Sequence, residues 1–148
     1  MKKTILVAIA AFLNVLLVYS QNYNTSQQGL INGIADFLES EGYKPEKVDD
    51  GLKFTYSGKV YYIEVSRTDT EPMCLRLRRY IKYTTKYTKD AVAEQLNSYN
   101  ALLGVKALCS EKAVILSSEM FLTDSSDFTS IFDYLMTRLI LVSFNFSE

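Results

Sequence analysis

The 148 residues of this chain include no histidine, which limits the catalytic and metal-binding chemistry that it can perform. Without an imidazole, the Ser-His-Asp and Cys-His nucleophile pairs, histidine metal ligands and the usual proton shuttle near neutral pH are excluded. No serine lies in a Gly-x-Ser-x-Gly turn, and the sequence has no glycine-rich phosphate loop. We therefore identify no catalytic residue and no cofactor site, and we expect a protein that is not an enzyme.

Positive charge is concentrated in residues 72–89, which contain six Lys and Arg residues and no acid. Alternation along a β-strand places part of this set on one face, opposite Leu75 and Leu77, and the following loop extends it. The predicted contact residues are Arg76, Arg78, Tyr80, Lys82 and Tyr83. Arginine forks pair with carboxylates or phosphates and tyrosine adds stacking area, so this surface is predicted to bind a protein partner or an acidic ligand. The alternative is a solvated face that acids such as Glu64 neutralise.

The two cysteines, Cys74 and Cys109, raise the question of a disulfide if the chain is exported. Strand alternation argues against the bridge, because Cys74 shares the face of Arg76 whereas Cys109 shares the face of Ala107. The disulfide remains an alternative to two free thiols. A thiolate at Cys74, or an unrecognised carboxylate site, is the remaining enzymatic alternative.

The acidic pairs of the sequence are interpreted as structural. Asp49 and Asp50 precede Gly51 in a turn signal, and Asp124 and Asp127 straddle the expected start of a helix. Neither pair has the Asp-x-Asp-x-Asp-Gly spacing of a calcium loop. We therefore predict no metal site.

The C-terminal helix, expected from about Ser125 or Ser126, is more apolar than one buried face requires. Its run from Leu139 to Val142 covers successive helical directions, and a helix end that is hydrophobic all round is buried on more than one side. One interpretation places this helix between a sheet and the first helix. The alternative is a groove or homodimer surface formed by Leu141, Val142, Phe144 and Phe146.

The N-terminus has the features of a secretory signal. Lys2 and Lys3 precede an apolar stretch of 16 residues, and Ser20 provides a small residue at the cleavage point. The stretch is shorter than the roughly 20 residues that cross a bilayer. We predict a cleaved signal over residues 1–20 and an exported chain over 21–148, in the periplasm or outside the cell. An uncleaved anchor is the alternative.

Loss of the signal changes the net charge from -1 to -3, since residues 1–20 hold two lysines and no acid. That value combines +6 in the segment 72–89 with -9 in the rest of the exported chain. A chain this close to neutral has no general affinity for nucleic acid or for an anionic membrane. We therefore expect no nucleic-acid partner. Since cleavage removes the apolar stretch, we also expect no stable membrane span in the exported chain.

The elements that must position these residues form a single α+β domain with no internal linker. The predicted helices lie at about 26–41, from the N-cap Thr88 to a stop at Gly104, and from Ser125 or Ser126 onwards. The predicted strands lie at 52–56, 61–66, 73–82, 105–109 and 113–118. The order α-β-β-β-α-β-β-α predicts an antiparallel five-stranded sheet with packed helices.

The element order and several short strings resemble the YbjN-like domains, whose fold is that of type III secretion chaperones. The strings are Phe37-Leu-Glu-Ser-Glu-Gly-Tyr43, Gly51-Leu-Lys-Phe-Thr-Tyr56, Tyr62-Ile-Glu-Val65 and Ala91-Val-Ala-Glu-Gln-Leu-Asn97, and the resemblance spans about residues 26–145. It implies a non-enzymatic sensory or secretion-related domain, with chaperone relatives that bind extended peptide as dimers. This chain departs from cytosolic chaperones by its export signal.

Together these observations predict an exported, non-catalytic binding or chaperone-like module that contacts a protein partner. A periplasmic carrier of a lipid or polyanionic ligand is the alternative from a different class. A homodimer through the C-terminal helix is compatible with both.

Overall fold

The computed structural model describes residues 23–100, 104–144 and 146. The predicted signal at 1–20 lies outside the described residues, as do residues 101–103 of the predicted second helix. Over the described ranges the chain forms the helices α2 (Thr25–Ser40), α3 (Lys89–Tyr99) and α4 (Ser125–Phe144). Its strands are β1 (Glu46–Val48), β2 (Gly51–Tyr56), β3 (Lys59–Val65), β4 (Met73–Lys82), β5 (Lys106–Cys109) and β6 (Ala113–Leu122).

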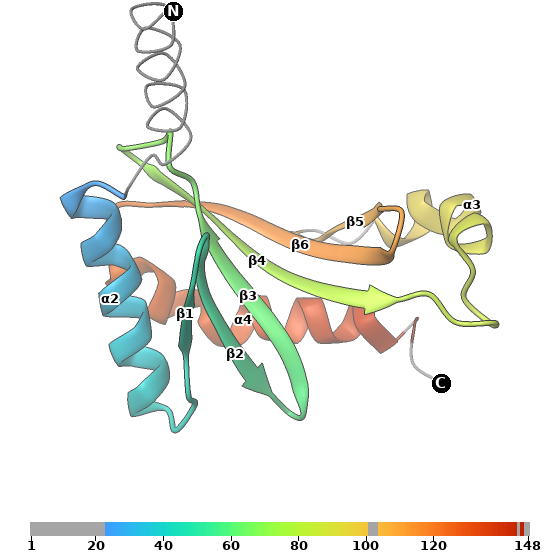
Figure 1. Ribbon diagram of the computed structural model, residues 1–148, viewed down its shortest axis with the longest axis horizontal. Helices are drawn as coiled ribbons and strands as arrows, with labels where there is room; N and C mark the ends of the chain where they lie inside the picture. The colour runs from blue at the N-terminus through green and yellow to red at the C-terminus, as the bar shows by residue number, and fades with distance from the viewer. Residues whose placement is uncertain (1–22, 101–103, 145, 147–148) are drawn as a thin grey trace, which may run out of the picture.

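The strands form one antiparallel sheet in the order β1-β2-β3-β4-β6-β5 (Figure 1). The α+β class and the antiparallel sheet are confirmed, but the predicted number of five strands is wrong, because the sheet has six. The additional strand is β1, in which all three residues are exposed. A strand without a buried side chain has no apolar alternation to reveal it.

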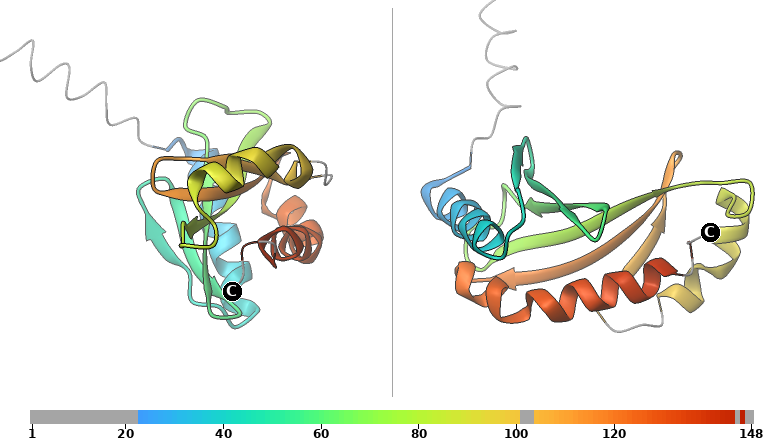
Figure 2. Two further views of the ribbon diagram at one scale, coloured as in Figure 1. Left: turned by 90° about the vertical axis from the view of Figure 1, so that its right-hand side faces the viewer. Right: turned by 90° about the horizontal axis from the view of Figure 1, so that it is seen from below.

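Helices α2 and α4 cover one face of the sheet (Figures 1 and 2). Helix α4 lies across the back of the sheet in Figure 1, and α2 lies beside the N-terminal end of α4. A Cβ on Gly33 of α2 would collide with the side chain of Ser125, at the start of α4. Gly33 therefore allows the start of α4 to pack closely against α2. Helix α3 lies at the other end of the molecule and contacts β5 (Figure 2).

An aromatic cluster joins the two covering helices to the sheet. Phe132 of α4 is 3% exposed and lies at its centre, with ring centroids 5.3 to 6.4 Å from those of its neighbours. The neighbours are Phe37, Tyr43, Phe54, Tyr56 and Phe128. Most of these pairs are tilted or edge-to-face, which are favourable arrangements for aromatic rings. This cluster holds the helices on the inner face and leaves the opposite face of the sheet without a helix in the described part of the chain.

Candidate binding surface on the outer face of the sheet

The face of the sheet opposite α2 and α4, here called the outer face, carries most of the predicted contact residues. The register pairs Arg78 with Tyr62 and Arg76 with Glu64, so these side chains point to the same side. Tyr80 follows on that side, while Leu75 and Leu77 are fully buried on the inner face. The predicted strand alternation is therefore confirmed for Arg76, Arg78, Tyr80 and Lys82, of which Tyr80 and Lys82 are exposed.

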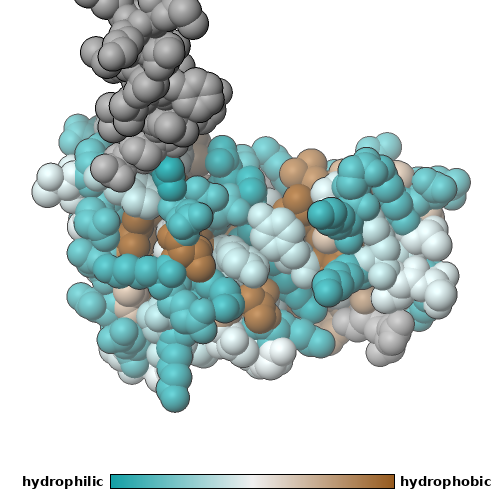
Figure 3. Space-filling view, viewed as in Figure 1, coloured by the Kyte–Doolittle hydropathy of each residue, from teal (hydrophilic) through white to brown (hydrophobic). Residues whose placement is uncertain are grey.

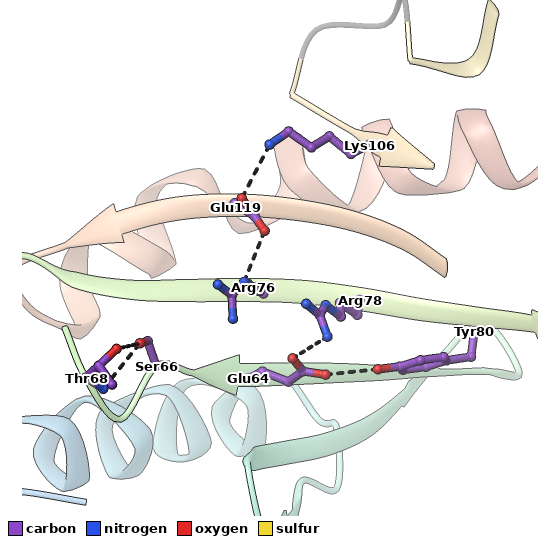
Figure 4. Close-up of polar contacts among 8 residues, drawn as sticks. All are labelled: Glu64, Ser66, Thr68, Arg76, Arg78, Tyr80, Lys106 and Glu119. Atoms are coloured by element: carbon purple, nitrogen blue, oxygen red, sulfur yellow. Dashed lines mark hydrogen bonds and ion pairs between the residues drawn. The ribbon is translucent and has the colours of Figure 1, made fainter. Parts of the chain in front are cut away.

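The two arginines of this set are already paired with acids (Figure 4). Arg78 forms an ion pair of 2.6 Å with Glu64, and both side chains are at least three-quarters buried. Arg76 donates to Glu119 on β6 at 3.0 Å, and Lys106 lies 3.5 Å from the other oxygen of the same carboxylate. The outer face is therefore a set of matched charges, as in the alternative of a neutralised strand face, rather than a free basic surface.

Tyr80 completes the central network by donating a hydrogen bond to Glu64 at 3.0 Å. Burial lowers the pKa of Arg78, but Tyr80 and Glu64 outweigh that effect and raise it. Burial also raises the pKa of Tyr80, which therefore remains a protonated donor at neutral pH. Because Arg78 and Glu64 hold each other, neither is free to form a new ion pair with a ligand at no cost.

The carboxylate of Glu119 gives this face a measurable pH dependence. Burial alone would raise its pKa, but hydrogen bonding to Arg76 and the charge of Lys106 outweigh burial and lower it. A lowered folded-state pKa means that the pair stabilises the fold above the ordinary carboxyl pKa, and that this stability is lost as the pH falls through the folded-state value.

We expect Glu119→Gln to lower the free energy of unfolding by about 0.5–1 kcal/mol at pH 7, a value discounted for solvent screening because the side chains of Arg76 and Glu119 are 36% and 37% exposed. The difference from the parent protein should shrink as the pH falls through the lowered pKa of Glu119, because protonation removes the charge that the variant lacks. Urea unfolding between pH 2.5 and 7 measures this difference in unfolding free energy. Asp133→Asn is the control, because it removes one exposed acid from α4. A difference that persists undiminished at pH 2.5 would show that packing, not charge, is responsible.

Tyr83, the fifth predicted contact residue, lies on the other side of the sheet. Its ring packs against the hydrophobic core, and its hydroxyl donates to the carbonyl of Ser110 at 2.9 Å. Burial, followed by a hydrogen bond with Cys109, raises the pKa of Tyr83 to about 12. Tyr83 tethers the end of β4 to the β5–β6 turn and does not contribute to the outer face.

The proposed surface at the C-terminal end of α4 is divided by the structure. Val142 is fully buried and Phe146 is 6% exposed, so both belong to the core, where the ring of Phe146 meets that of Tyr87 edge-to-face. Leu141 and Phe144 are exposed on the other side of the chain. A groove or dimer surface made of all four residues is therefore not formed, which corrects that expectation. The apolar end of α4 is therefore buried on one side of the helix, and Leu141 and Phe144 are exposed on the other.

The two cysteines are free and far apart. Cys74 lies opposite Phe121 and Cys109 lies opposite Val114, so they are separated by seven residues along β6. At about 3.3 Å per residue this is roughly 23 Å, well beyond the roughly 7 Å that a disulfide can span. The alternative of a bridge is therefore wrong. Burial raises the pKa of the Cys74 thiol despite the charge of Arg76, which disfavours a reactive thiolate there.

Sequence reasoning missed the exposed apolar side chains of the outer face other than Tyr80. Exposed large hydrophobic residues on this face are Val48, Val60, Tyr80, Leu108 and Phe121. Phe121 is 67% exposed and Leu108 is 48% exposed. Figure 3 shows this face as apolar groups set among hydrophilic ones. One signal could have revealed this surface. Phe121 follows the predicted end of the last strand at Ser118, and extending the alternation to it would have placed its ring on the outer face.

A pocket of about 430 Å³ opens between the β1–β2 turn and the strands β3 and β4. Its lining residues are Val48, Asp49, Asp50, Tyr62, Glu64 and Tyr80. Among the described residues, no group of three acidic or cysteine side chains is arranged to hold a metal ion, and no helix is both long and apolar enough to cross a membrane. The pocket combines tyrosine rings with carboxylates, which is a composition suited to organic cations rather than to anions.

Comparison with known proteins identifies a related fold but no activity. No protein-family model matches the sequence, and no curated protein matches it significantly. Among solved structures, the chain is similar to YbjN from E. coli, a candidate transcription regulator, with a TM-score of 0.59 over 76% of this chain and 87% of that one. The two sequences are 12% identical over the match. The resemblance seen in the sequence is thereby confirmed at the level of architecture, and the chain has a YbjN-like fold.

Proposed function

We propose that the protein is an exported, non-catalytic binding module that docks a segment of a protein partner on the outer face of its sheet. The observation that carries the proposal is the set of exposed apolar side chains on that face, with Phe121 as its most exposed member. Aromatic and aliphatic groups surrounded by paired charges are typical of protein interfaces. The YbjN-like fold is compatible with such a role, and the N-terminal sequence supports export.

The charges of the outer face favour a polypeptide over a polyanion. Arg76 and Arg78 are matched by Glu119 and Glu64, so a phosphate or a sulfated sugar would have to displace a carboxylate to reach them. The pocket on the same face is lined by acids. A carrier of polyanionic ligand is therefore the less supported alternative.

A site-specific photo-crosslinking experiment tests the docking face. A photoreactive phenylalanine analogue replaces Phe121 in the full chain expressed in its own host, and Tyr134 on α4, which is 48% exposed, is the control position. The partner captured at position 121 is then purified and its affinity is measured directly. We expect Phe121→Asp to weaken that affinity at least tenfold and Tyr134→Asp to leave it unchanged, since central aromatic anchors dominate interfaces.

Equal affinity of both variants for the purified partner would refute the docking face. Crosslinks confined to position 134 would do the same. Fractionation of the same cells tests export separately, because a protein that retains residues 1–20 and remains in the cytoplasm contradicts it.

A further inference from the structure

The pocket on the outer face has two aromatic walls at a right angle. The rings of Tyr62 on β3 and Tyr80 on β4 have centroids 5.3 Å apart and an interplanar angle of 88°. The hydroxyl of Tyr80 is fixed by its hydrogen bond to Glu64, as Figure 4 shows. Val48 of β1 adds an aliphatic wall. The pocket is therefore a preformed corner of aromatic and aliphatic surface.

The acids around this corner leave negative charge that is not matched by the protein. Glu64 is paired with Arg78 at 2.6 Å, and Asp50 lies 3.3 Å from Arg67. Asp49 is exposed, and its carboxylate has no ion-pair partner in the part of the chain that the structure describes. The charges of Glu64 and Asp50 are thus neutralised by arginines, and the carboxylate of Asp49 is available to a ligand.

Tyrosine faces attract cations through the ring quadrupole, and a nearby carboxylate adds a direct attraction. The three acids do not converge as a metal site, so a compact inorganic ion is a poor fit. An alkylammonium group fits both parts, because its carbon chain packs on Val48 and the rings while its charge faces Asp49.

We infer that the corner of Tyr62, Tyr80 and Val48 with Asp49 at its rim binds an alkylammonium group, which a lysine side chain of the docked partner supplies. We assign the alkylammonium group to a lysine of the partner because the pocket opens on the outer face, where the partner segment is proposed to dock. In this respect the inference rests on the proposed function. The binding of the group itself can be measured without any partner.

The test uses n-butylammonium as the probe and the exported chain labelled at its tyrosine rings, followed by NMR. We expect saturable shifts of the Tyr62 and Tyr80 ring signals with a dissociation constant on the order of 1–10 mM, because one cation and a short chain make few contacts. Binding should weaken as the salt concentration rises. The uncharged analogue 1-butanol, which has the same carbon chain, should bind at least about fivefold more weakly.

Two pairs of variants separate the rings from the charge. Tyr80→Ala should weaken butylammonium binding at least about fivefold, whereas Tyr80→Phe, which keeps the ring, should restore most of it. Asp49→Asn should weaken binding about threefold, and Asp133→Asn, which removes one exposed acid from α4, should leave it unchanged. Equal binding of 1-butanol, or no effect of Tyr80→Ala and Asp49→Asn, would overturn the inference.

Failure of this inference can be told apart from failure of the docking face. Phe121 pairs with Cys74, six residues along β4 from Tyr80, so Phe121→Asp should weaken partner docking at least tenfold without changing probe binding. If the probe does not bind while Phe121→Asp still weakens the partner, the pocket inference alone is wrong. If the probe binds but Tyr80→Ala and replacement of each lysine in the partner segment leave docking unchanged, the assignment to a partner lysine is wrong.

Discussion

Gly51→Ala is expected to lower the free energy of unfolding by about 3 kcal/mol or more. Gly51 is buried at the start of β2, with φ at +140°, a backbone conformation that residues with a Cβ rarely adopt. A Cβ at this position would also overlap the backbone carbonyl oxygen of Ile63 on β3. Conformational strain of about 1–3 kcal/mol then adds to a steric conflict that only a backbone shift can relieve.

Gly58→Ala is the matched control for this expectation. Gly58 also has positive φ, at +72°, but a Cβ there would meet nothing within 4 Å. Its cost should be the conformational strain alone, about 1–2 kcal/mol. Urea unfolding of both variants measures the difference, and equal costs would show that the approach of Ile63 to Gly51 is not tight in solution.

Local sequence signals were sufficient for most of the fold. The N-cap at Thr88 was predicted from a side chain that accepts from nearby backbone, and the last helix was predicted to begin at Ser125 or Ser126. Both are confirmed. Turn glycines and alternating apolar residues gave the strands β2, β3, β4 and β5 to within two residues. These features depend on neighbours in the chain, which is why a single sequence reveals them.

The end of strand β6 was not predicted correctly from these local signals. It was predicted to stop at Ser118, but it continues through Leu122 and pairs along the whole of β4. Phe121 interrupts the alternation because it is apolar yet points outward. With the strand cut short, Glu119 could not be placed opposite Arg76, and the neutralisation of that arginine was not foreseen.

The pocket was beyond sequence reasoning for a different reason. Asp49 and Asp50 were interpreted as turn residues, and the turn does connect β1 to β2. Their meeting with Tyr62 and Tyr80 depends on sheet order and register, which join residues far apart in the chain. Alternation predicts which face a side chain occupies, but not which side chains lie beside it.

The second large effect is expected at Phe132, on the inner face. Phe132→Ala should lower the free energy of unfolding by about 3–5 kcal/mol, because it removes a ring that is 3% exposed and leaves a cavity among five other aromatic rings. Phe144→Ala makes the same change on the same helix at a side chain that is 65% exposed, and it should cost less than about 0.5 kcal/mol.

The two faces of the sheet should therefore respond in opposite ways. Phe132→Ala acts on the packing of α2 and α4, so the molecules that remain folded should bind n-butylammonium and the partner with unchanged affinity. Phe121→Asp removes an exposed ring, so it should reduce partner affinity with a change in unfolding free energy below about 1 kcal/mol. Urea unfolding and affinity measured on the same four variants, including Phe144→Ala and Tyr134→Asp, test this division. Loss of affinity in folded Phe132→Ala would mean that the covering helices, and not the outer face, form the binding surface.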